Sequence, residues 1–358
     1  MQKNLKLRLG VVATLAAAVL AFGAASPASA DPSGPKDING TGSDTTQDLV
    51  SGVATVVSNL GSYDAIGTPT ITVNGTSFNR PVGSGAGVRA LSSSIRGIAY
   101  AGTVLPVGTL QFARSSALRT ESGSQLTYIP FAKDAVTVAS SAASDFPKDV
   151  SLGAVGQASN VFTLRNIYLG TVTSFVDSNL TAITIRPLLP QQNSGTRNFW
   201  VTALGTTEAA LTAGGKATDL GNTVIEHDGS FLKTDGDIVP FSIAQFISQG
   251  NYRTLPTAVV ERRGNIALSS IDGAKPIVYA GGLVQLNADF PVSRLVYNVV
   301  ETRALTTTTP TSSDSAIQAA FAGSGSSICA ATTQIKQYGF GTIGTQCGNT
   351  SAQRGYVN

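Results

Sequence analysis

The sequence predicts an α/β fold built from two domains. Strand-like and helix-like segments alternate along most of the chain, a pattern that is typical of sheets flanked by helices. The chain has 358 residues, more than one hydrophobic core usually serves, which indicates two cores. Only 13% of the residues are charged and 38 are glycine, a composition that favours many turns and strands with short helices.

The first third of the chain repeats one plan, in which a strand leads through a small polar turn to the start of a helix. Residues 45–60 follow such a turn, and their apolar side chains fit one helical face. A second helical run, residues 88–95, follows a second glycine-rich turn. Residues 71–73 and 110–116 alternate with these runs and predict strands.

The remaining chain continues the alternation. Two longer strand-like runs, residues 126–139 and 294–300, enclose the region between them. Within that region we expect helices at residues 163–169 and 199–204, a strand at 183–185, and a strand followed by a helix across 237–248. These segments complete the evidence for an α/β architecture.

The first thirty residues are typical of a secretory signal peptide. Three basic side chains precede an apolar run at residues 9–25, and Ala-Ser-Ala at residues 28–30 offers the small-x-small pattern of a cleavage site. We expect cleavage after Ala30 and export. Asp31 follows the cut where a lipoprotein would need a cysteine, so we expect no lipid anchor. No later stretch approaches the roughly twenty apolar residues that span a bilayer.

Beyond residue 30 the chain is electrically balanced. The whole sequence has 24 basic and 21 acidic residues, and the first thirty residues hold three of the basic ones and no acidic one. The remaining charges are therefore equal in number. This balance argues against nucleic acid as a partner and against insertion into a membrane surface, since both depend on a basic face.

The two cysteines of the chain, Cys329 and Cys347, lie near its far end. In an exported protein two cysteines predict one disulfide, because the compartment is oxidising. Closing a loop of this length stabilises a fold by about 3 kcal/mol in the chain-entropy model.

Three turns place hydroxyl groups and small residues where a helix is about to start. They are residues 43–46, 83–85 and 193–196. Unpaired backbone N–H groups and the helix dipole favour an anion at such a position. Converging turns would form a neutral cradle of N–H and O–H donors around an oxyanion, whereas each turn alone has the composition of an ordinary helix cap.

The order of these motifs resembles the phosphate-binding proteins that serve ABC importers, and especially secreted relatives from actinobacteria that share a Gly-Ser-Asp-Thr-Thr-Gln-Asp start. The matching segments are residues 42–48, Gly-Ser-x-x-Gly-Val at 83–88, the strand end at 112–116, Ile-Tyr-x-Gly at 167–170 and Ser-Gly-Thr at 194–196. Each motif alone is common, and their ordered set is what makes the resemblance specific.

The resemblance implies a two-lobed, periplasmic-binding-protein-like (type II) fold with a ligand cleft between the lobes. Residues 31–36 would be a flexible leader. Lobe I would then comprise residues 37–139 and 292–358 with the disulfide, and lobe II residues 140–291. The strands at 126–139 and 294–300 would cross between the lobes, and hinge motion would close them on the ligand.

The resemblance also implies a set of ligand contacts. They are Thr45, Thr46, Ser84, Ser116, Ser194, Gly195 and Thr196. Two positions depart from the family. Ser116 stands where the family has an Asp that accepts the proton of hydrogen phosphate, and residues 189–191 lack the family's Arg.

Asp44, Arg114 and Arg197 lie close enough in sequence to the turns to replace the missing Asp and Arg. The alternative is equally open at this point. Asp44 would then be an N-cap, and both arginines would face solvent.

The function that the resemblance implies is extracellular solute binding, with phosphate or a similar oxyanion held between the lobes for uptake. An ABC permease is a candidate partner, no cofactor is expected, and the protein would act as a monomer. The alternative is a secreted non-transport protein that uses the same fold for surface adhesion or sequestration. An enzyme is not expected, because no Gly-x-Ser-x-Gly elbow precedes a helix.

The chain's single histidine lies in the run Glu226-His227-Asp228. A metal site or a catalytic dyad could be imagined here. Adjacent residues seldom point at one ion, however, and no second histidine or free cysteine completes a ligand set. We therefore expect neither a metal site nor a catalytic residue.

Overall fold

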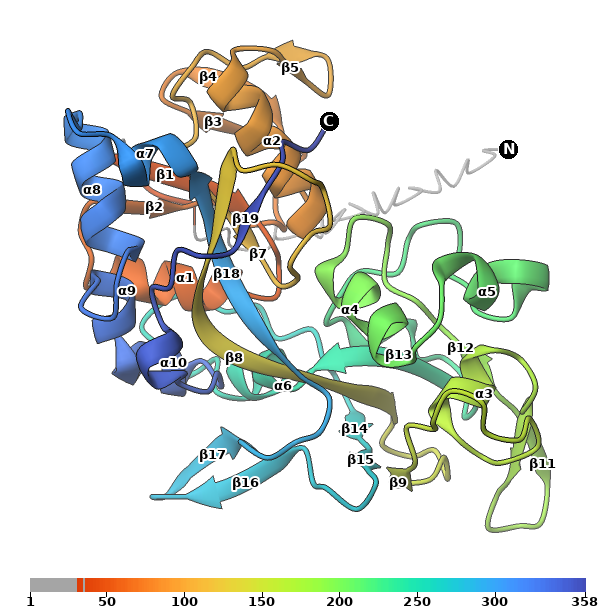
Figure 1. Cartoon of the computed structure of the whole chain (residues 1–358). Coiled ribbons are helices and arrows are strands. Elements are labelled where there is room, and N and C mark those ends of the chain that lie inside the picture. Colours follow the sequence, from red (N-terminus) through yellow and green to blue (C-terminus); the bar gives the residue numbers. More distant parts are fainter. Residues whose placement is uncertain (1–30, 35) are drawn as a thin grey trace, which may run out of the picture.

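Two long strands organise the molecule. In the computed structural model, which describes residues 31–34 and 36–358, β8 (Leu126–Ser141) and β18 (Ser293–Glu301) run antiparallel beside each other. They connect two lobes that lie side by side (Figure 1). The predicted signal peptide falls outside the described residues.

One mixed sheet passes from one lobe into the other. Among the described residues its main path runs in the order β12-β13-β8-β18-β7-β1-β2, and β14 and β19 also pair with β8. We call the part around β7, β1 and β2 lobe I and the part around β12 and β13 lobe II. The bounds are β1 (Ile38–Gly42), β2 (Leu60–Ser62), β7 (Phe112–Ser115), β12 (Arg186–Pro187), β13 (Asp237–Ser242), β14 (Ile266–Leu268) and β19 (Gln353–Arg354).

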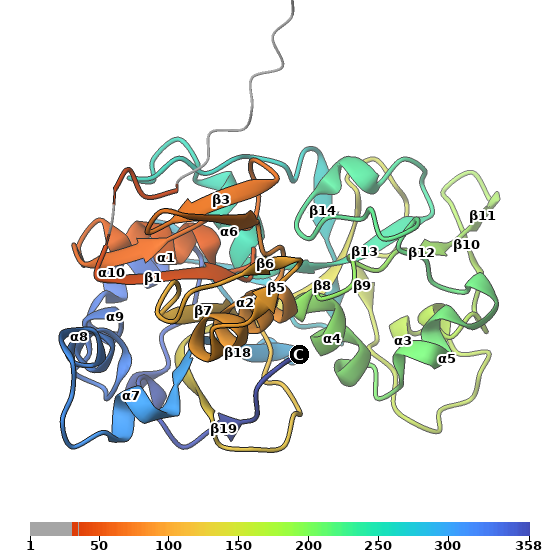
Figure 2. The same ribbon diagram turned by 90° about the horizontal axis from the view of Figure 1, so that it is seen from above.

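The strand directions in lobe I bring several loops to one edge. β1 pairs in parallel with both β2 and β7, so the carboxyl ends of these strands lie at the same edge of the sheet. The loop after β1 leads into α1 (Gln47–Ala54), and α2 (Ser84–Arg96) packs against β7 and β1. Figure 2 shows α2 next to lobe II, on the side of α4 (Gly195–Ala203).

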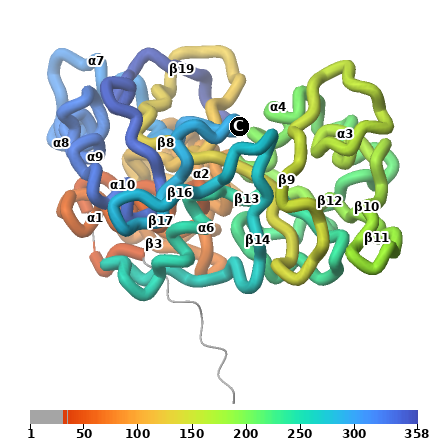
Figure 3. Tube along the Cα trace, turned by 90° about the horizontal axis from the view of Figure 1, so that it is seen from below, coloured from red at the N-terminus to blue at the C-terminus, as the bar shows by residue number. Residues whose placement is uncertain are grey.

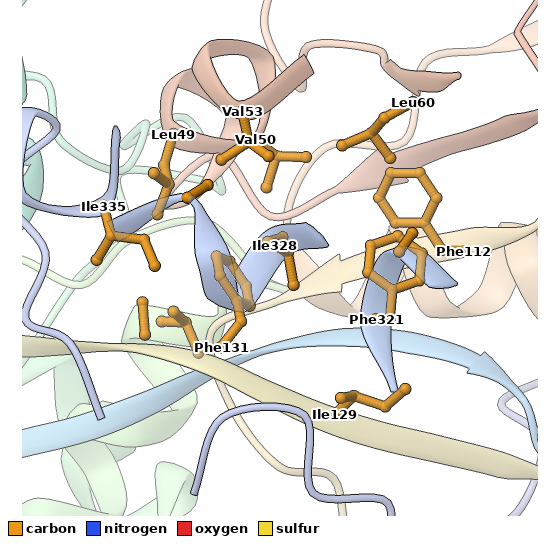
Figure 4. Close-up of a cluster of buried hydrophobic side chains, with 14 of the residues drawn as sticks. Leu49, Val50, Val53, Leu60, Phe112, Ile129, Phe131, Phe321, Ile328 and Ile335 are labelled. Carbon is orange, nitrogen blue, oxygen red and sulfur yellow. The ribbon is translucent and has the colours of Figure 1, made fainter. Parts of the chain in front are cut away.

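The core of lobe I combines residues from the beginning and the end of the described chain. Figure 3 shows these segments, in red and blue, in the same lobe. Figure 4 shows part of this core, to which α1 contributes Leu49, Val50 and Val53. The C-terminal helices are α7 (Thr302–Thr306), α8 (Ser312–Phe321), α9 (Ser327–Ala330) and α10 (Thr332–Gln337). The last three contribute Phe321, Ile328 and Ile335.

Lobe II has a second core around Trp200 of α4. The Tyr168 ring, at the end of α3 (Leu164–Tyr168), meets the Trp200 ring edge to face with 5.7 Å between the ring centres. α6 (Ile243–Gly250) serves both lobes, because Ile243 packs in the core of lobe II and Ala244 in that of lobe I. The short α5 (Glu208–Thr212) follows α4.

Small two-stranded units decorate both lobes. The hairpins are β3 (Thr70–Val73) with β4 (Thr76–Asn79), β5 (Ala99–Tyr100) with β6 (Thr103–Val104), β10 (Ser174–Val176) with β11 (Ala182–Thr184), and β16 (Ile277–Ala280) with β17 (Leu283–Leu286). β9 (Asp149–Val150) pairs in parallel with β15 (Ser270–Ile271). Among the described residues, no helix combines the length and the apolar character needed to cross a bilayer.

The structure confirms the α/β prediction and most of the predicted elements. The helix expected at residues 45–60 ends at Ala54, and the chain then turns before β2. The helix expected at 199–204 begins earlier, at Gly195, because Ser194 caps it. The disulfide joins Cys329 to Cys347 as predicted. The lobe boundaries at residues 139 and 292 stay a prediction.

Candidate functional site

The three polar turns meet where the two lobes touch. The backbone N–H of Gly85 donates to the carbonyl oxygen of Asn193 over 3.1 Å. In lobe I the hydroxyl groups of Ser84 and Ser116 are hydrogen-bonded at 3.2 Å. Gly195 of lobe II packs against this pair so closely that a Cβ atom there would lie 2.2 Å from Oγ of Ser116. A larger residue at position 195 would therefore force these serine hydroxyls or the lobes themselves to shift.

Two threonines, one from each lobe, face each other at this junction. Thr45 follows β1, and Thr196 lies in the first turn of α4, which is fixed by a hydrogen bond from the Arg197 N–H to the Ser194 hydroxyl. The Oγ1 atoms of Thr45 and Thr196 are 3.4 Å apart, and both residues are fully buried. Both hydroxyl groups can serve a ligand between the lobes.

The carboxylate of Glu226 lies at the point where these hydroxyls meet. Its Oε2 accepts a hydrogen bond from Oγ1 of Thr196 over 2.7 Å and from Oγ1 of Thr45 over 3.2 Å. Nε2 of His227 lies 3.1 Å from the same oxygen. The side chains of Glu226 and His227 are completely buried. A negatively charged oxygen is thus surrounded by donors from both lobes.

The backbone of His227 explains why two adjacent side chains reach one point. Its φ of +59° is in the left-handed region, which side chains other than glycine rarely adopt. The Ser242 N–H donates to Nδ1 of His227 over 3.4 Å, which assigns the ring proton to Nε2. Nε2 faces the Glu226 carboxylate and lies 3.0 Å from Oγ1 of Thr45. The expectation that adjacent residues would not converge is therefore wrong for Glu226 and His227.

Arg294 supplies a positive charge next to this point. It lies opposite Asp134 in the β8–β18 pair, and its Nε and Nη2 donate to Oδ2 of Asp134 over 3.0 and 2.8 Å. Nη2 also donates to Oγ1 of Thr196 over 2.9 Å. Nη1 is buried without a partner in the described part of the chain, and the guanidinium lies over the Phe199 ring.

Asp134 is in turn held by the start of α6. Its Oδ1 accepts hydrogen bonds from the Ser242 hydroxyl over 2.8 Å and from the Ala244 N–H over 3.1 Å. These contacts fix the carboxylate that orients Arg294.

The buried acids have opposite pKa shifts. Burial and the charge of Glu226 raise the pKa of Asp44 well above its usual value. Burial would also raise the pKa of Glu226, but hydrogen bonds from His227, Ser194 and Thr196 outweigh it and lower that pKa. Burial lowers the pKa of His227. These shifts favour the ionised form of Glu226 and the protonated form of Asp44.

A cavity of about 500 Å³ opens beside the donor cluster. Its lining includes Ser116, Arg119, Asn198, Phe199, Arg294 and Tyr297. Ser116 and Arg294 belong both to this lining and to the junction, so the cavity adjoins the donor cluster.

Thr46 and Asp44, the residues on either side of Thr45 in the chain, are both buried. Thr46 is the fully buried N-cap residue of α1, and its hydroxyl has no partner among the described residues. Asp44 is also fully buried, with Oδ1 accepting the Thr45 N–H over 3.1 Å. One ligand atom each of Asp44, Glu226 and His227 lies within 4.8 Å of the others, a spacing that could suit a metal ion.

Arg114 and Arg197 do not replace the family's missing arginine. Arg114 points into lobe I, where it donates to the carbonyl oxygens of Gly42 and Ser43 and to the Ser62 hydroxyl. Both arginines are buried, so the alternative that they face solvent is also wrong.

Arg197 is occupied inside lobe II. Its Nη1 donates to Oδ2 of Asp219 and to the Pro190 carbonyl, and its Nη2 donates to Glu208. The guanidinium that contacts Thr196 is instead that of Arg294, which the sequence predicted only as part of a strand.

Residues 27–278 match the family model described as a PBP superfamily domain. Among solved structures, an ABC-type phosphate transport receptor from Vibrio cholerae is similar at 14% identity and a TM-score of 0.49, over 86% of this chain and 100% of that one. A phosphate-binding protein from Stenotrophomonas maltophilia is similar at 13% identity and a TM-score of 0.48, over 86% and 91%. No curated protein sequence matches. Because the family model covers well over half of its length, the chain belongs to the PBP superfamily, whose mixed α/β fold it shares.

Proposed function

We propose that this protein binds a small oxyanion, with phosphate as the first candidate, between its two lobes. The observation that carries the proposal is the position of Oε2 of Glu226. This buried negative oxygen accepts hydrogen bonds from Thr45 of lobe I and Thr196 of lobe II. A point that stabilises one anionic oxygen without solvent is suited to the oxygens of another anion.

The character of the surrounding groups favours an oxyanion. The threonine hydroxyls, Nε2–H of His227 and Nη1 of Arg294 are all donors, and Nη1 is without a partner among the described residues. Fixed donors in a dry site bind an anion more strongly than the same groups in water.

Asp44 would distinguish phosphate from sulfate in this site. Burial and the charge of Glu226 favour the protonated form of Asp44. Once a solute takes the place of Glu226 at the donors, an ionised Asp44 carboxylate would accept the proton of hydrogen phosphate, which sulfate lacks at neutral pH. An Asp44→Asn protein should therefore lose its preference for phosphate. Unchanged anion affinity in this variant would remove Asp44 from the site.

Uptake is the role that we propose for this binding. The exported protein would act as a monomer without a lipid anchor and pass its anion to an ABC permease. Export predicts that the protein from the culture medium begins at Asp31, which N-terminal sequencing would reveal. A protein that retains its first thirty residues would contradict export.

Calorimetric titration with phosphate, sulfate, arsenate and molybdate tests the ligand. We expect phosphate and arsenate to bind, because they share shape and protonation. If no anion binds to the wild-type protein or to variants of the junction, the binding proposal fails. The alternative of adhesion or sequestration would then be favoured.

A further inference from the structure

We propose that Glu226 is a built-in ligand of this protein, whose carboxylate occupies the oxyanion point, holds the lobes closed in the absence of solute, and must be displaced when an anion binds. Oε2 of Glu226 accepts hydrogen bonds from Thr45 of lobe I and Thr196 of lobe II at the same time. Glu226 is 1% exposed, so no solvent competes for these hydrogen bonds.

The loop that carries Glu226 is fixed on three sides. Its N–H donates to Oε1 of Gln191 over 3.1 Å, and the carbonyl of His227 accepts from Nε2 of Gln249 over 2.9 Å. The N–H of Gly229 donates to the carbonyl of Arg262 over 2.9 Å. These bonds hold His227 in a left-handed conformation that residues with a Cβ atom rarely adopt. Strain of this kind persists where the surrounding structure enforces it, typically at functional positions.

Glu226 and an oxyanion cannot use the same donors together. Each threonine hydroxyl has a single hydrogen to donate, and both hydrogens are directed at Oε2 of Glu226. A second anion within a few ångströms would also be repelled by the Glu226 charge, strongly so in a dry interior. Binding of the solute therefore requires Glu226 to withdraw or to take up a proton.

The same geometry disfavours a cation at this point. The Ser242 N–H occupies Nδ1 of His227, which leaves the proton on Nε2 and no lone pair for a metal. Burial and the nearby charge of Glu226 raise the pKa of Asp44. A proton on the Asp44 carboxyl group therefore relieves the repulsion between the two acids without a metal ion.

A built-in ligand has a measurable consequence for affinity. Only molecules in which Glu226 has left the donors can bind an anion. The apparent affinity is therefore the intrinsic affinity multiplied by the fraction of such molecules. The protein would then respond to an oxyanion that competes well for the threonines, and it would ignore weaker anions.

The test compares Glu226→Gln, which keeps the shape, and Glu226→Ala with the wild-type protein. Glu261→Gln is the matched control, because Glu261 pairs with Arg263 on the surface. Small-angle X-ray scattering without anions measures closure, and calorimetry measures phosphate affinity. We expect Glu226→Ala to have a larger radius of gyration than wild type and control, and Glu226→Gln to bind phosphate about tenfold more tightly.

The two measurements separate the possible failures. Equal radii of gyration for wild type and Glu226→Ala would show that Glu226 does not hold the lobes. Weaker phosphate binding by Glu226→Gln would make Glu226 a ligand contact instead of a competitor. The affinity comparison rests on the proposed function, whereas the scattering comparison does not. If neither the wild type nor any variant binds an anion, the proposed function fails. The radii of gyration of wild type and Glu226→Ala then decide alone whether Glu226 holds the lobes closed.

Elemental analysis of the purified protein decides between the proton and a metal. Wild-type protein free of stoichiometric metal supports the inference. A divalent metal that is present in the wild type and lost in Glu226→Gln would overturn it.

Discussion

Arg294 lies directly opposite Asp134 in the antiparallel pair of strands that joins the lobes, and two of its guanidinium nitrogens donate to one oxygen of that carboxylate. Both side chains are almost completely buried. The pair fixes the guanidinium whose Nη2 reaches Thr196. The strands that join the lobes therefore also position a donor group of the candidate anion site.

Replacing Asp134 should destabilise the whole protein. In Asp134→Asn the Arg294 charge stays buried without its counter-charge, and the free energy of unfolding should fall by about 3–5 kcal/mol. Urea denaturation measures the change. Glu301→Gln is the control, because Glu301 pairs with the exposed Arg303, and it should change stability by less than about 0.5 kcal/mol. Equal stability of the two variants would contradict this account of the pair.

Gly195→Ala should separate closure from folding. The added Cβ would lie 2.2 Å from Oγ of Ser116, 2.5 Å from Oγ of Ser84 and 3.2 Å from Cβ of Ser84, and we expect this crowding to push the lobes apart. Alanine is favoured over glycine in a helix, and each lobe should fold normally. We expect unchanged urea denaturation, a larger radius of gyration, and phosphate affinity reduced about tenfold. Gly325→Ala, which has open space around it, should leave all three unchanged. An unaltered radius for Gly195→Ala would refute the tight contact.

Removing the Thr45 hydroxyl should weaken the site itself. Thr45→Val keeps the shape and deletes a donor to the negative oxygen. A hydrogen bond to a charged group is worth about 1.5–3 kcal/mol, so phosphate affinity should fall by about one to two orders of magnitude. Calorimetry measures the loss. Thr72→Val is the control, because Thr72 is exposed and its hydroxyl is hydrogen-bonded to that of Ser77, away from the junction. Equal phosphate affinity in both variants would exclude Thr45 from the site.

Asp237 should contribute stability that depends on pH. Burial would raise its pKa, but hydrogen bonds from Arg186, Thr234 and the Lys233 N–H outweigh burial and lower it. A lowered pKa means that stability is fully present above the unfolded value of about 3.9 and is lost as the pH falls through the folded pKa. Asp237→Asn should therefore be less stable than wild type at pH 7, by about 3 kcal/mol.

The difference between Asp237→Asn and wild type should begin to shrink below about pH 4, where Asp237 of the unfolded chain takes up a proton, and should disappear as the pH falls through the lowered pKa of the folded state. Urea denaturation at a series of pH values between about 2 and 7 measures this difference in stability. A difference that stays constant over the range would show that the charge of Asp237 is not what stabilises the fold.

The sequence predicted the α/β fold and the place of the three turns, because both depend on local patterns. Hydrophobic periodicity marks the elements, and small polar residues mark the helix starts that carry Thr45 and Thr196. Glu226 and His227 were assigned no role, because a positive φ at His227 has no signature in a sequence without glycine or asparagine at that position.

Arg294 and Asp134 did leave a signal in the sequence. Each is a charged residue inside a strand that is otherwise mostly apolar. Their register, which sets them opposite each other, depends on how two segments 160 residues apart in sequence pair. Local patterns do not determine that pairing.

The most direct test of the anion site is a crystal structure of the wild-type protein grown with arsenate, whose arsenic atom can be located by anomalous scattering. We predict an anomalous peak between Thr45 and Thr196, within hydrogen-bonding reach of Arg294, with the Glu226 carboxylate withdrawn from both hydroxyls. Crystals that show Glu226 still bound to both threonines at saturating arsenate, with no arsenic at the junction, would contradict it.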